Sequence, residues 1–285
     1  MKRSGMPTAA RLKYLLWAGI RFLNADTACP ACKEAQTLLL RRKYGVTALY
    51  RCPSCELMFR VPKPSAEECI EFYQSDYSQG FTTDCPRPDE LRKLTDCSFA
   101  GTEKDYSTYI DVLRSIPLSS GSSILDFGCS WGYGSWQLAR AGYQVYSFEV
   151  SRPRARYAAE KLGCNICAPQ KLPEKVDCLF SAHVIEHLAN PRQIWEVARE
   201  VVKPRGIVVL FLPNGEPFRE SIDRDYHKHW GQVHPLLISP LAMRRMSERC
   251  GFTPRCYSSP YSLQEIAAKA QGVETGAELL VVASG

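Results

Sequence analysis

Two acidic residues bracket a glycine-containing turn between residues 123 and 151. Asp126 lies in a short apolar run that predicts a buried strand, and Glu149 closes a second such run. Gly128 and Gly132 stand between them, where glycine lets the backbone pass close to a ligand. A strand, a glycine turn, a helix and a second strand ending in a carboxylate form a nucleotide-binding βαβ unit, because the acid can accept hydrogen bonds from both ribose hydroxyls.

Asp126 separates the candidate ligands of this turn. It stands two residues before the first glycine, where the pyrophosphate of a dinucleotide would meet an unwelcome carboxylate. S-adenosylmethionine carries an amino group and a sulfonium but no phosphate, so it suits this acid better. We expect the cofactor to contact Asp126, Gly128, Cys129, Ser130, Gly132, Glu149 and Ser181.

The turn resembles motif I of the class I S-adenosylmethionine-dependent methyltransferases, usually Asp/Glu-x-Gly-x-Gly-x-Gly. Asp126, Gly128 and Gly132 match this motif, whereas Ser130 replaces the middle glycine, and serine disfavours a positive φ. Later landmarks of the family follow in order at residues 176–181, 183–188 (its "vlEHl" segment), 201–212, 250–252 and 278–283. The resemblance covers residues 100 to 285. It implies an α/β, Rossmann-like core of seven strands, mostly parallel with an antiparallel last strand, whose third strand holds residues 164–167.

Four cysteines near the N-terminus form two Cys-x-x-Cys knuckles, Cys29 with Cys32 and Cys52 with Cys55. Four thiolates in two such turns meet the tetrahedral demand of a structural zinc ion. The residues between the knuckles, at 37–40 and 48–51, predict two short strands of a zinc ribbon. Because four cysteines close the coordination shell, we expect this zinc to hold the N-terminal fold rather than to take part in catalysis.

The order of these features resembles that of sugar C-methyltransferases that act on nucleotide-linked deoxysugars, and of many small-molecule methyltransferases. We expect an amphipathic N-terminal helix at 1–25, the zinc ribbon at 26–65, a helical lid or linker at 66–117 and the S-adenosylmethionine-binding domain at 118–285. In the sugar enzymes the segment between ribbon and core folds over the cofactor. The resemblance gives this role to Tyr73 and Tyr77, which as an i, i+4 pair could equally form a helix face packed on the core.

Positive charge is concentrated before the core. Residues 1–65 hold twelve Lys and Arg against three acids, a net charge of +9, and the remaining residues carry a net −3. This asymmetry indicates either an anionic partner, such as a nucleotide-sugar, RNA, an acyl carrier protein or an acidic membrane surface, or a solvated basic face without a partner. Thirteen cysteines without a secretory signal predict a reducing, cytoplasmic location.

Residues 9–23 place leucines on one face of a helix and contain no acid. Arg21 interrupts this stretch, which is the only apolar run near transmembrane length. A helix of this kind suits organelle targeting or a membrane surface. The alternative, which we favour, is a helix packed on the body of the protein or on a dimer partner.

The five histidines fall within one fifth of the chain, at His183, His187, His227, His229 and His234. His183 follows the fourth strand, at the carboxyl edge where open α/β sheets bind ligands. Methyl transfer is an in-line displacement, and an alcohol or carbon acid must also lose a proton, a task that suits histidine. We predict His183 as the general base and His187 as the second choice. His187 could instead cap a helix or contact Glu186.

A metal site is a further hypothesis for these histidines. The pattern His183-x-x-Glu186-His187 with a later histidine resembles the metal site of small-RNA 2′-O-methyltransferases and of some quinone-biosynthesis O-methyltransferases. In those enzymes a divalent ion binds two substrate oxygens. The resemblance implies a divalent metal at His183, Glu186 and His187, with His227, His229 or His234 closing the set. Glutamate followed by histidine is also widespread in this branch without metal.

Three functions remain open from the sequence. The leading one is methyl transfer to O or C of a small biosynthetic intermediate, such as a sugar-nucleotide or polyketide, that is anionic or carrier-linked. The second is methylation of RNA, held by the basic ribbon region. The third is a non-catalytic scaffold that binds the cofactor, which Ser130 and the lack of an adenine-binding acid near Gln170 would favour. The substrate and the oligomeric state do not follow from the residues.

Overall fold

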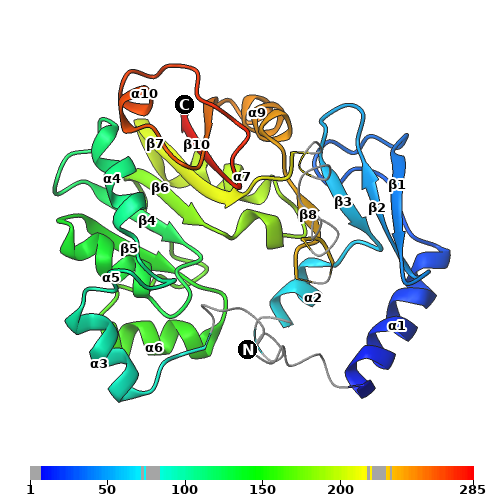
Figure 1. The fold of residues 1–285 in the computed structure, drawn as a ribbon, viewed down its shortest axis with the longest axis horizontal. Coiled ribbons are helices and arrows are strands. Elements are labelled where there is room, and N and C mark those ends of the chain that lie inside the picture. The colour runs from blue at the N-terminus through cyan, green and yellow to red at the C-terminus, as the bar shows by residue number, and fades with distance from the viewer. Residues whose placement is uncertain (1–7, 72–73, 75–83, 217–218, 220–228, 232) are drawn as a thin grey trace.

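Two β-sheets and the helices around them form the fold (Figure 1). The computed structural model describes residues 8–71, 74, 84–216, 219, 229–231 and 233–285. The first part of the chain forms α1 (Thr8–Leu23), β1 (Leu38–Lys43), β2 (Thr47–Arg51), β3 (Met58–Val61), α2 (Ala66–Glu71), α3 (Pro88–Asp96) and α4 (Ser107–Ser115). The second part forms β4 (Ser123–Phe127), α5 (Tyr133–Arg140), β5 (Gln144–Phe148), α6 (Arg152–Leu162), β6 (Val176–Ala182), the 3₁₀ turn η2 (Ile185–His187), α7 (Gln193–Val201), β7 (Val202–Pro213), β8 (Leu236–Leu237), α9 (Pro240–Arg249), β9 (Thr253–Ser258), α10 (Leu263–Ala267) and β10 (Glu278–Ser284).

The larger sheet has the strand order β5-β4-β6-β7-β10-β9. β4 pairs in parallel with β5 and β6, β6 pairs in parallel with β7, and β10 runs antiparallel to both β7 and β9. Every residue of β4 is buried, as expected for a strand whose sheet is covered on both faces. Two hydrophobic clusters pack on the sheet. The Rossmann-like fold and the antiparallel last strand are therefore confirmed.

The expected third strand at residues 164–167 is wrong. Only Ile166 pairs there, in a single parallel bridge with Ser147. α6 ends at Gly163 immediately before this segment, and a bridge between Ala168 and Lys171 turns the chain immediately after it. Too few extended residues remain between these two turns to form a strand, so the described sheet has six strands rather than seven.

The smaller sheet contains the predicted ribbon strands and has the order β1-β2-β3-β8. β1 and β2 pair antiparallel, as the residues between the knuckles predict, and β3 follows the second knuckle. β8 comes from the segment after β7 and pairs Leu236 with Phe59 and Leu237 with Met58. The ribbon is thus joined to the rest of the protein by backbone hydrogen bonds.

Within the segment predicted as an N-terminal helix, residues 8–23 form α1, which contacts β2 of the ribbon (Figure 1). No helix in the described ranges is long and apolar enough to cross a bilayer. The domain boundaries at 25, 65 and 117 stay predictions, although the ribbon sheet also takes in β8 from beyond them. Tyr73 and Tyr77 lie outside the described residues.

The turn after β4 keeps a left-handed backbone at all three motif positions. The φ angles are 89° at Gly128, 53° at Ser130 and 92° at Gly132. Ser130 therefore adopts the conformation that a glycine would adopt without strain. Its buried hydroxyl has no hydrogen-bond partner among the described residues. The serine replaces the usual glycine at a cost in stability, but the shape of the turn is kept.

Ser130→Gly should raise the free energy of unfolding by about 1 kcal/mol, because it relieves the strained φ and removes an unpaired buried hydroxyl. Thermal denaturation of the cofactor-free protein should show a melting temperature about 2–4 °C higher. Ser135→Gly is the matched control: its hydroxyl donates to Asp126, so that variant should melt lower than the wild type. A Ser130→Gly protein that melts at or below the wild-type temperature would contradict this reading of the turn.

Candidate functional site

Asp126 and Glu149 meet at the carboxyl edge of the larger sheet because β4 and β5 are parallel neighbours, with Asp126 paired to Ser147. The Glu149 carboxylate accepts the backbone N–H of Ser130 at 2.9 Å and that of Ser151 at 2.7 Å. These two bonds tie the glycine turn to the end of β5. A carboxylate can accept about four hydrogen bonds, so Glu149 keeps acceptor capacity for a ligand.

The Asp126 side chain is 1% exposed. It accepts a hydrogen bond from the Ser135 hydroxyl at 2.6 Å, and Ser147 donates to Ser135 in turn at 2.8 Å. Burial raises the pKa of Asp126 to about 7; the Ser135 bond opposes this rise and the Glu149 charge adds to it. A ligand with a positive charge would therefore stabilise the ionised form of this carboxylate.

Cys129 and Ser181 lie at the turn, and both donate hydrogen bonds to carbonyls of the protein. The backbone N–H of Cys129 donates to the Phe148 carbonyl at 3.0 Å. The hydroxyl of Ser181, at the end of β6, donates to the Phe127 carbonyl at 2.7 Å. Both residues are buried and support the strand ends around the turn. Their contacts with the cofactor stay predictions.

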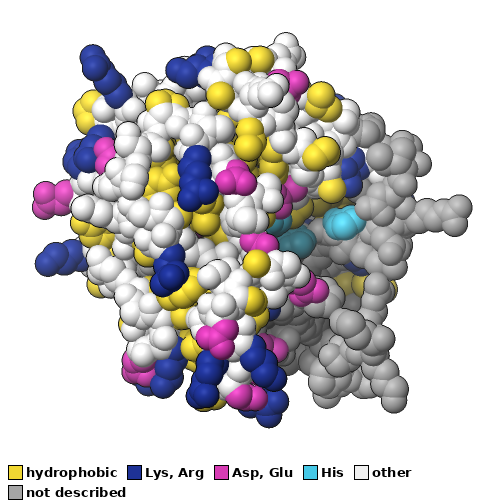
Figure 2. Space-filling model, turned by 60° about the vertical axis from the view of Figure 1, so that its left-hand side comes forward, with side chains coloured by type: hydrophobic (Ala, Val, Ile, Leu, Met, Phe, Trp, Pro, Cys, Tyr) yellow, Lys and Arg dark blue, Asp and Glu magenta, His cyan; other side chains and the backbone are white. Residues whose placement is uncertain are grey.

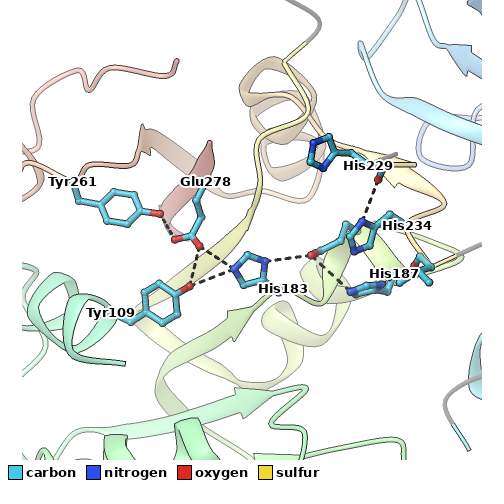
Figure 3. Close-up of polar contacts among 9 residues, drawn as sticks. Tyr109, His183, His187, His229, His234, Tyr261 and Glu278 are labelled. Atoms are coloured by element: carbon cyan, nitrogen blue, oxygen red, sulfur yellow. Dashed lines mark hydrogen bonds and ion pairs between the residues drawn. The ribbon is translucent and has the colours of Figure 1, made fainter. Parts of the chain in front are cut away.

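His183 belongs to a network of side chains at the end of β6 (Figure 3). Its Nε2 lies 2.9 Å from the Glu278 carboxylate and 3.3 Å from the Tyr109 hydroxyl. Tyr109 and Tyr261 both donate hydrogen bonds to Glu278. Its Nδ1 faces the opposite way, 3.6 Å from Oε1 of Glu186. The His183 ring therefore lies between two carboxylates.

The two carboxylates decide the charge of His183. Burial by itself lowers the pKa of its imidazole, but contact with Glu186 and Glu278 outweighs burial and raises the pKa to about 10. The side chain is 44% exposed, and Figure 2 shows histidine side chains in a hollow of the surface. The ring is thus protonated near neutral pH and must lose that proton before it can act as a base. Its predicted role as general base stays a prediction.

Glu186, His187 and His234 form a second cluster next to this network. The Glu186 side chain is 3% exposed, and neither of its carboxylate oxygens has a hydrogen-bond partner within the described ranges. Nε2 of His187 faces Glu186 at 3.8 Å. Nδ1 of His187 lies 2.7 Å from the Val233 carbonyl, and Nδ1 of His234 lies 3.1 Å from the His229 carbonyl.

Those carbonyl contacts fix which ring nitrogen is an acceptor. A carbonyl can only accept, so each Nδ1 carries a hydrogen, and Nε2 is the ring nitrogen left for a ligand. The three ligand atoms of Glu186, His187 and His234 lie within 4.8 Å of one another. Burial lowers the pKa of His234 to about 4, with the His187 charge adding to this shift, so the His234 ring is neutral. A buried anion and two lone pairs that face each other are the donor set of a divalent cation.

This grouping corrects the predicted ligand set, because His234 takes the place of His183. Glu278 and the two tyrosines hold the His183 ring at the other side of Glu186 (Figure 3). His229 contributes its carbonyl to the cluster, and His227 lies outside the described residues. The sequence reasoning missed Glu278, Tyr109 and Tyr261. Of these three, only Glu278 could have been noticed in the sequence, because it is an acid at the start of an otherwise mostly apolar strand.

The four ribbon cysteines come together as the sequence predicts. Sγ of Cys29 lies 3.5 Å from that of Cys55, and Sγ of Cys32 lies 3.4 Å from that of Cys52. Tetrahedral zinc with bonds near 2.3 Å would set its sulfurs about 3.8 Å apart. Hydrogen bonding from Cys55 lowers the pKa of Cys29 to about 5. Burial raises the pKa of Cys52 to about 11, so of these two cysteines only Cys29 favours the thiolate form. The sulfur geometry suits zinc, and the ion itself stays a prediction.

Comparisons with known proteins agree with the geometry of the turn. Residues 125–210 match the family described as "Methyltransferase domain". A ubiquinone biosynthesis O-methyltransferase of Cereibacter sphaeroides is 28% identical over 138 residues, which cover 45% of this chain and 56% of the relative. An uncharacterised methyltransferase of Geobacillus sp. is 29% identical over 142 residues, which cover 45% of this chain and 66% of that protein. The chain thus spans little more than half the length of the ubiquinone relatives that it matches.

Solved structures share the fold. The plantazolicin methyltransferase BamL, in complex with a triazolic desmethylPZN analog and SAH, superposes with a TM-score of 0.50 at 14% identity and covers 75% of this chain and 93% of that one. At this identity the likeness concerns the fold alone. Together with the family match and the acid-bracketed glycine turn, it shows that the chain carries a class I S-adenosylmethionine-dependent methyltransferase domain.

Proposed function

We propose that this protein transfers the methyl group of S-adenosylmethionine to an oxygen of a small molecule that presents two neighbouring oxygens to a divalent cation. The observation that carries the proposal is the buried Glu186 carboxylate, which lacks a hydrogen-bond donor among the described residues and faces two histidines. The name of the relatives, ubiquinone biosynthesis O-methyltransferase, supports oxygen as the acceptor atom.

The residues of the glycine turn fit the cofactor. Glu149 accepts hydrogen bonds from the backbone N–H groups of Ser130 and Ser151 and keeps acceptor capacity for the ribose hydroxyls. Asp126 is a buried acid that gains from a nearby cation, and the Ser130 hydroxyl is buried without a partner. S-adenosylmethionine supplies the electrophilic methyl group, while these residues bind and orient the molecule.

Glu186, His187 and His234 fit a divalent cation of the kind that takes one carboxylate and two imidazoles, such as Mn²⁺, Fe²⁺ or Zn²⁺. A cation bound there would lower the pKa of a substrate hydroxyl and orient it. His187 is held for this task by Val233, and His234 by the His229 carbonyl. Backbone carbonyls of this kind commonly fix the ring of a metal-binding histidine.

His183 is placed to handle the proton of the acceptor hydroxyl. Its Nδ1 is on the side of Glu186, and its Nε2 bonds to Glu278 on the other side. Once the ring has lost the proton that it carries near neutral pH, Glu278 would orient the imidazole and stabilise the imidazolium formed when the ring takes the substrate proton, as the acid of a catalytic triad does. Tyr109 and Tyr261 hold Glu278 in place for this role.

The ribbon fits a supporting role for the cation site. We propose that zinc at the four cysteines stabilises β3, whose Arg60 N–H donates to the Pro235 carbonyl at 2.7 Å. Pro235 directly follows His234, so β3 fixes the backbone that carries this ligand. Three cations of this region are paired with acids, Arg21 of α1 with Glu68 and, in the ribbon, Arg51 with Glu56 and Lys63 with Asp26.

Glu186→Gln should abolish binding of a divalent cation at the cluster, because it removes the only carboxylate of the donor set. Electron paramagnetic resonance with added Mn²⁺ should detect one such site in the wild type besides the ribbon zinc, and none in the variant. With 3,4-dihydroxybenzoate as probe acceptor, a chelator should stop methyl transfer and Mn²⁺ should restore it. Glu274→Gln, which loses a half-buried ion pair with Arg244, is the control and should keep the site.

His183→Ala separates the two parts of the proposal. It should keep Mn²⁺ binding and cofactor affinity while turnover falls about a hundred- to ten-thousand-fold, the usual contribution of a general base. Mn²⁺ binding that survives in Glu186→Gln, or a wild-type rate that no chelator changes, would overturn the cation site.

Cys52→Ser should reduce the zinc content from one ion per chain to near zero, since three cysteines hold zinc far less well than four. Because the ribbon fixes the backbone beside His234, we also expect Mn²⁺ affinity to fall by about tenfold. Elemental analysis and Mn²⁺ titration measure the two effects. Cys97→Ser, an exposed cysteine outside the ribbon, should change neither; full zinc in Cys52→Ser would contradict the site.

The affinity for S-adenosylmethionine should fall as the pH drops below about 7. Burial holds the pKa of Asp126 at about 7, so the folded protein takes up a proton there as the pH falls, and that proton competes with the cationic ligand. Linkage limits the loss to about tenfold per pH unit. Calorimetry between about pH 5.5 and 8 should show this slope in the wild type and a flatter profile in Asp126→Asn. Equal slopes in both proteins would exclude Asp126 as the cause.

A further inference from the structure

α1 exposes an apolar stripe to solvent. The exposed fractions are 60% at Leu12, 60% at Leu16, 72% at Ile20 and 83% at Leu23. Their spacing places the four side chains within an arc of roughly 80° on the helix. Ala18, which lies on the opposite side, is fully buried. α1 therefore packs on the protein through Ala18 and turns these four aliphatic side chains outwards.

β1 lies beside α1 and also exposes leucines. It is the edge strand of the ribbon sheet, and Leu38, Leu39 and Leu40 are 53%, 44% and 42% exposed. The Arg42 guanidinium lies 5.3 Å from the centre of the Phe22 ring, so β1 and the end of α1 are in contact. Both elements lie at the end of the molecule away from the larger sheet (Figure 1). We call the four-residue stripe of α1 the apolar face.

The positive charge near the apolar face favours an anionic partner over a second copy of this chain. α1 contains Arg11 and Lys13 and no acid, its third cation Arg21 is paired with Glu68, and residues 1–65 carry a net charge of +9. A second copy of this chain would bring two acid-free, basic helices together, and the like charges would repel. An anionic lipid headgroup layer complements the charge and can take up the leucines. At 16 residues, α1 is too short to span a bilayer, so it would lie in the surface.

We propose that the apolar face docks this protein on an anionic lipid bilayer, with the aliphatic stripe of α1 in the interface and the basic residues of the region at the phosphate headgroups. The interaction does not depend on the methyl-transfer chemistry, because α1 and β1 contribute no residue to the cofactor turn or the histidine cluster.

Sedimentation with lipid vesicles tests the proposal. The full-length protein should bind vesicles of equal parts phosphatidylglycerol and phosphatidylcholine, and bind pure phosphatidylcholine vesicles at least tenfold more weakly. Ile20→Glu should lower binding to the anionic vesicles at least tenfold. Leu263→Glu is the matched control, because Leu263 is 40% exposed on α10 and the change in net charge is the same; it should bind like the wild type.

Thermal denaturation shows whether both variants are folded, which their exposed positions lead us to expect. Two outcomes would overturn the proposal. In one, Ile20→Glu binds anionic vesicles as tightly as the wild type; in the other, the wild type binds anionic and neutral vesicles equally. Light scattering gives the remaining test. A wild-type dimer that Ile20→Glu dissociates, without vesicle binding by the wild type, would assign the apolar face to a second copy instead.

Discussion

The short pairing of β3 with β8 is the constraint on which the candidate acceptor site depends. It joins residues 58–59 of the ribbon to residues 236–237, and the Arg60 N–H adds a bond to the Pro235 carbonyl. This backbone junction lies one residue beyond His234 and two beyond the Val233 carbonyl that holds His187. Two histidines of one cluster are therefore positioned by a strand that lies about 175 residues earlier in the chain. A two-residue pairing is weak alone, so its order rests on the ribbon behind it.

The ionised Glu186 carboxylate at the centre of the histidine cluster depends on its neighbours. Taking a carboxylate out of water is costly. Burial by itself raises the pKa of Glu186, but the His187 charge and the contact with His183, 3.6 Å away, outweigh burial and lower this pKa to about 2. A scaffold that keeps unfavourable groups together before the ligand arrives is what preorganisation requires. The four-cysteine centre supplies such a scaffold without contributing a ligand.

Motifs formed by residues close together in the sequence could be predicted. Side-chain contacts between residues far apart in the sequence could not. The cofactor turn and each cysteine knuckle depend on residues a few positions apart, so their spacing indicated both. Tyr109 and Glu278 share a hydrogen bond across 169 positions, and no local pattern records it. The prediction of a third strand at residues 164–167 was wrong for a related reason. Gly163, which caps α6, and the turn at Pro169 restrict pairing there to one residue. Ser130 shows the opposite case, because the fold imposes a left-handed φ of 53° that serine disfavours.

The donor and acceptor sites are neighbours because of one glycine. β4 and β6 are adjacent strands, so the turn after β4 and the segment after β6 leave the same edge of the sheet. A Cβ built on Gly128 would lie 2.4 Å from the Val184 side chain, which shows that the two segments pack directly on each other there. Val184 is flanked by His183 and followed closely by Glu186. In-line methyl transfer tolerates little error in the distance between the methyl carbon and the attacking atom. Any side chain at position 128 would push the histidine segment away from the cofactor turn, so the glycine sets the separation across which the reaction must occur.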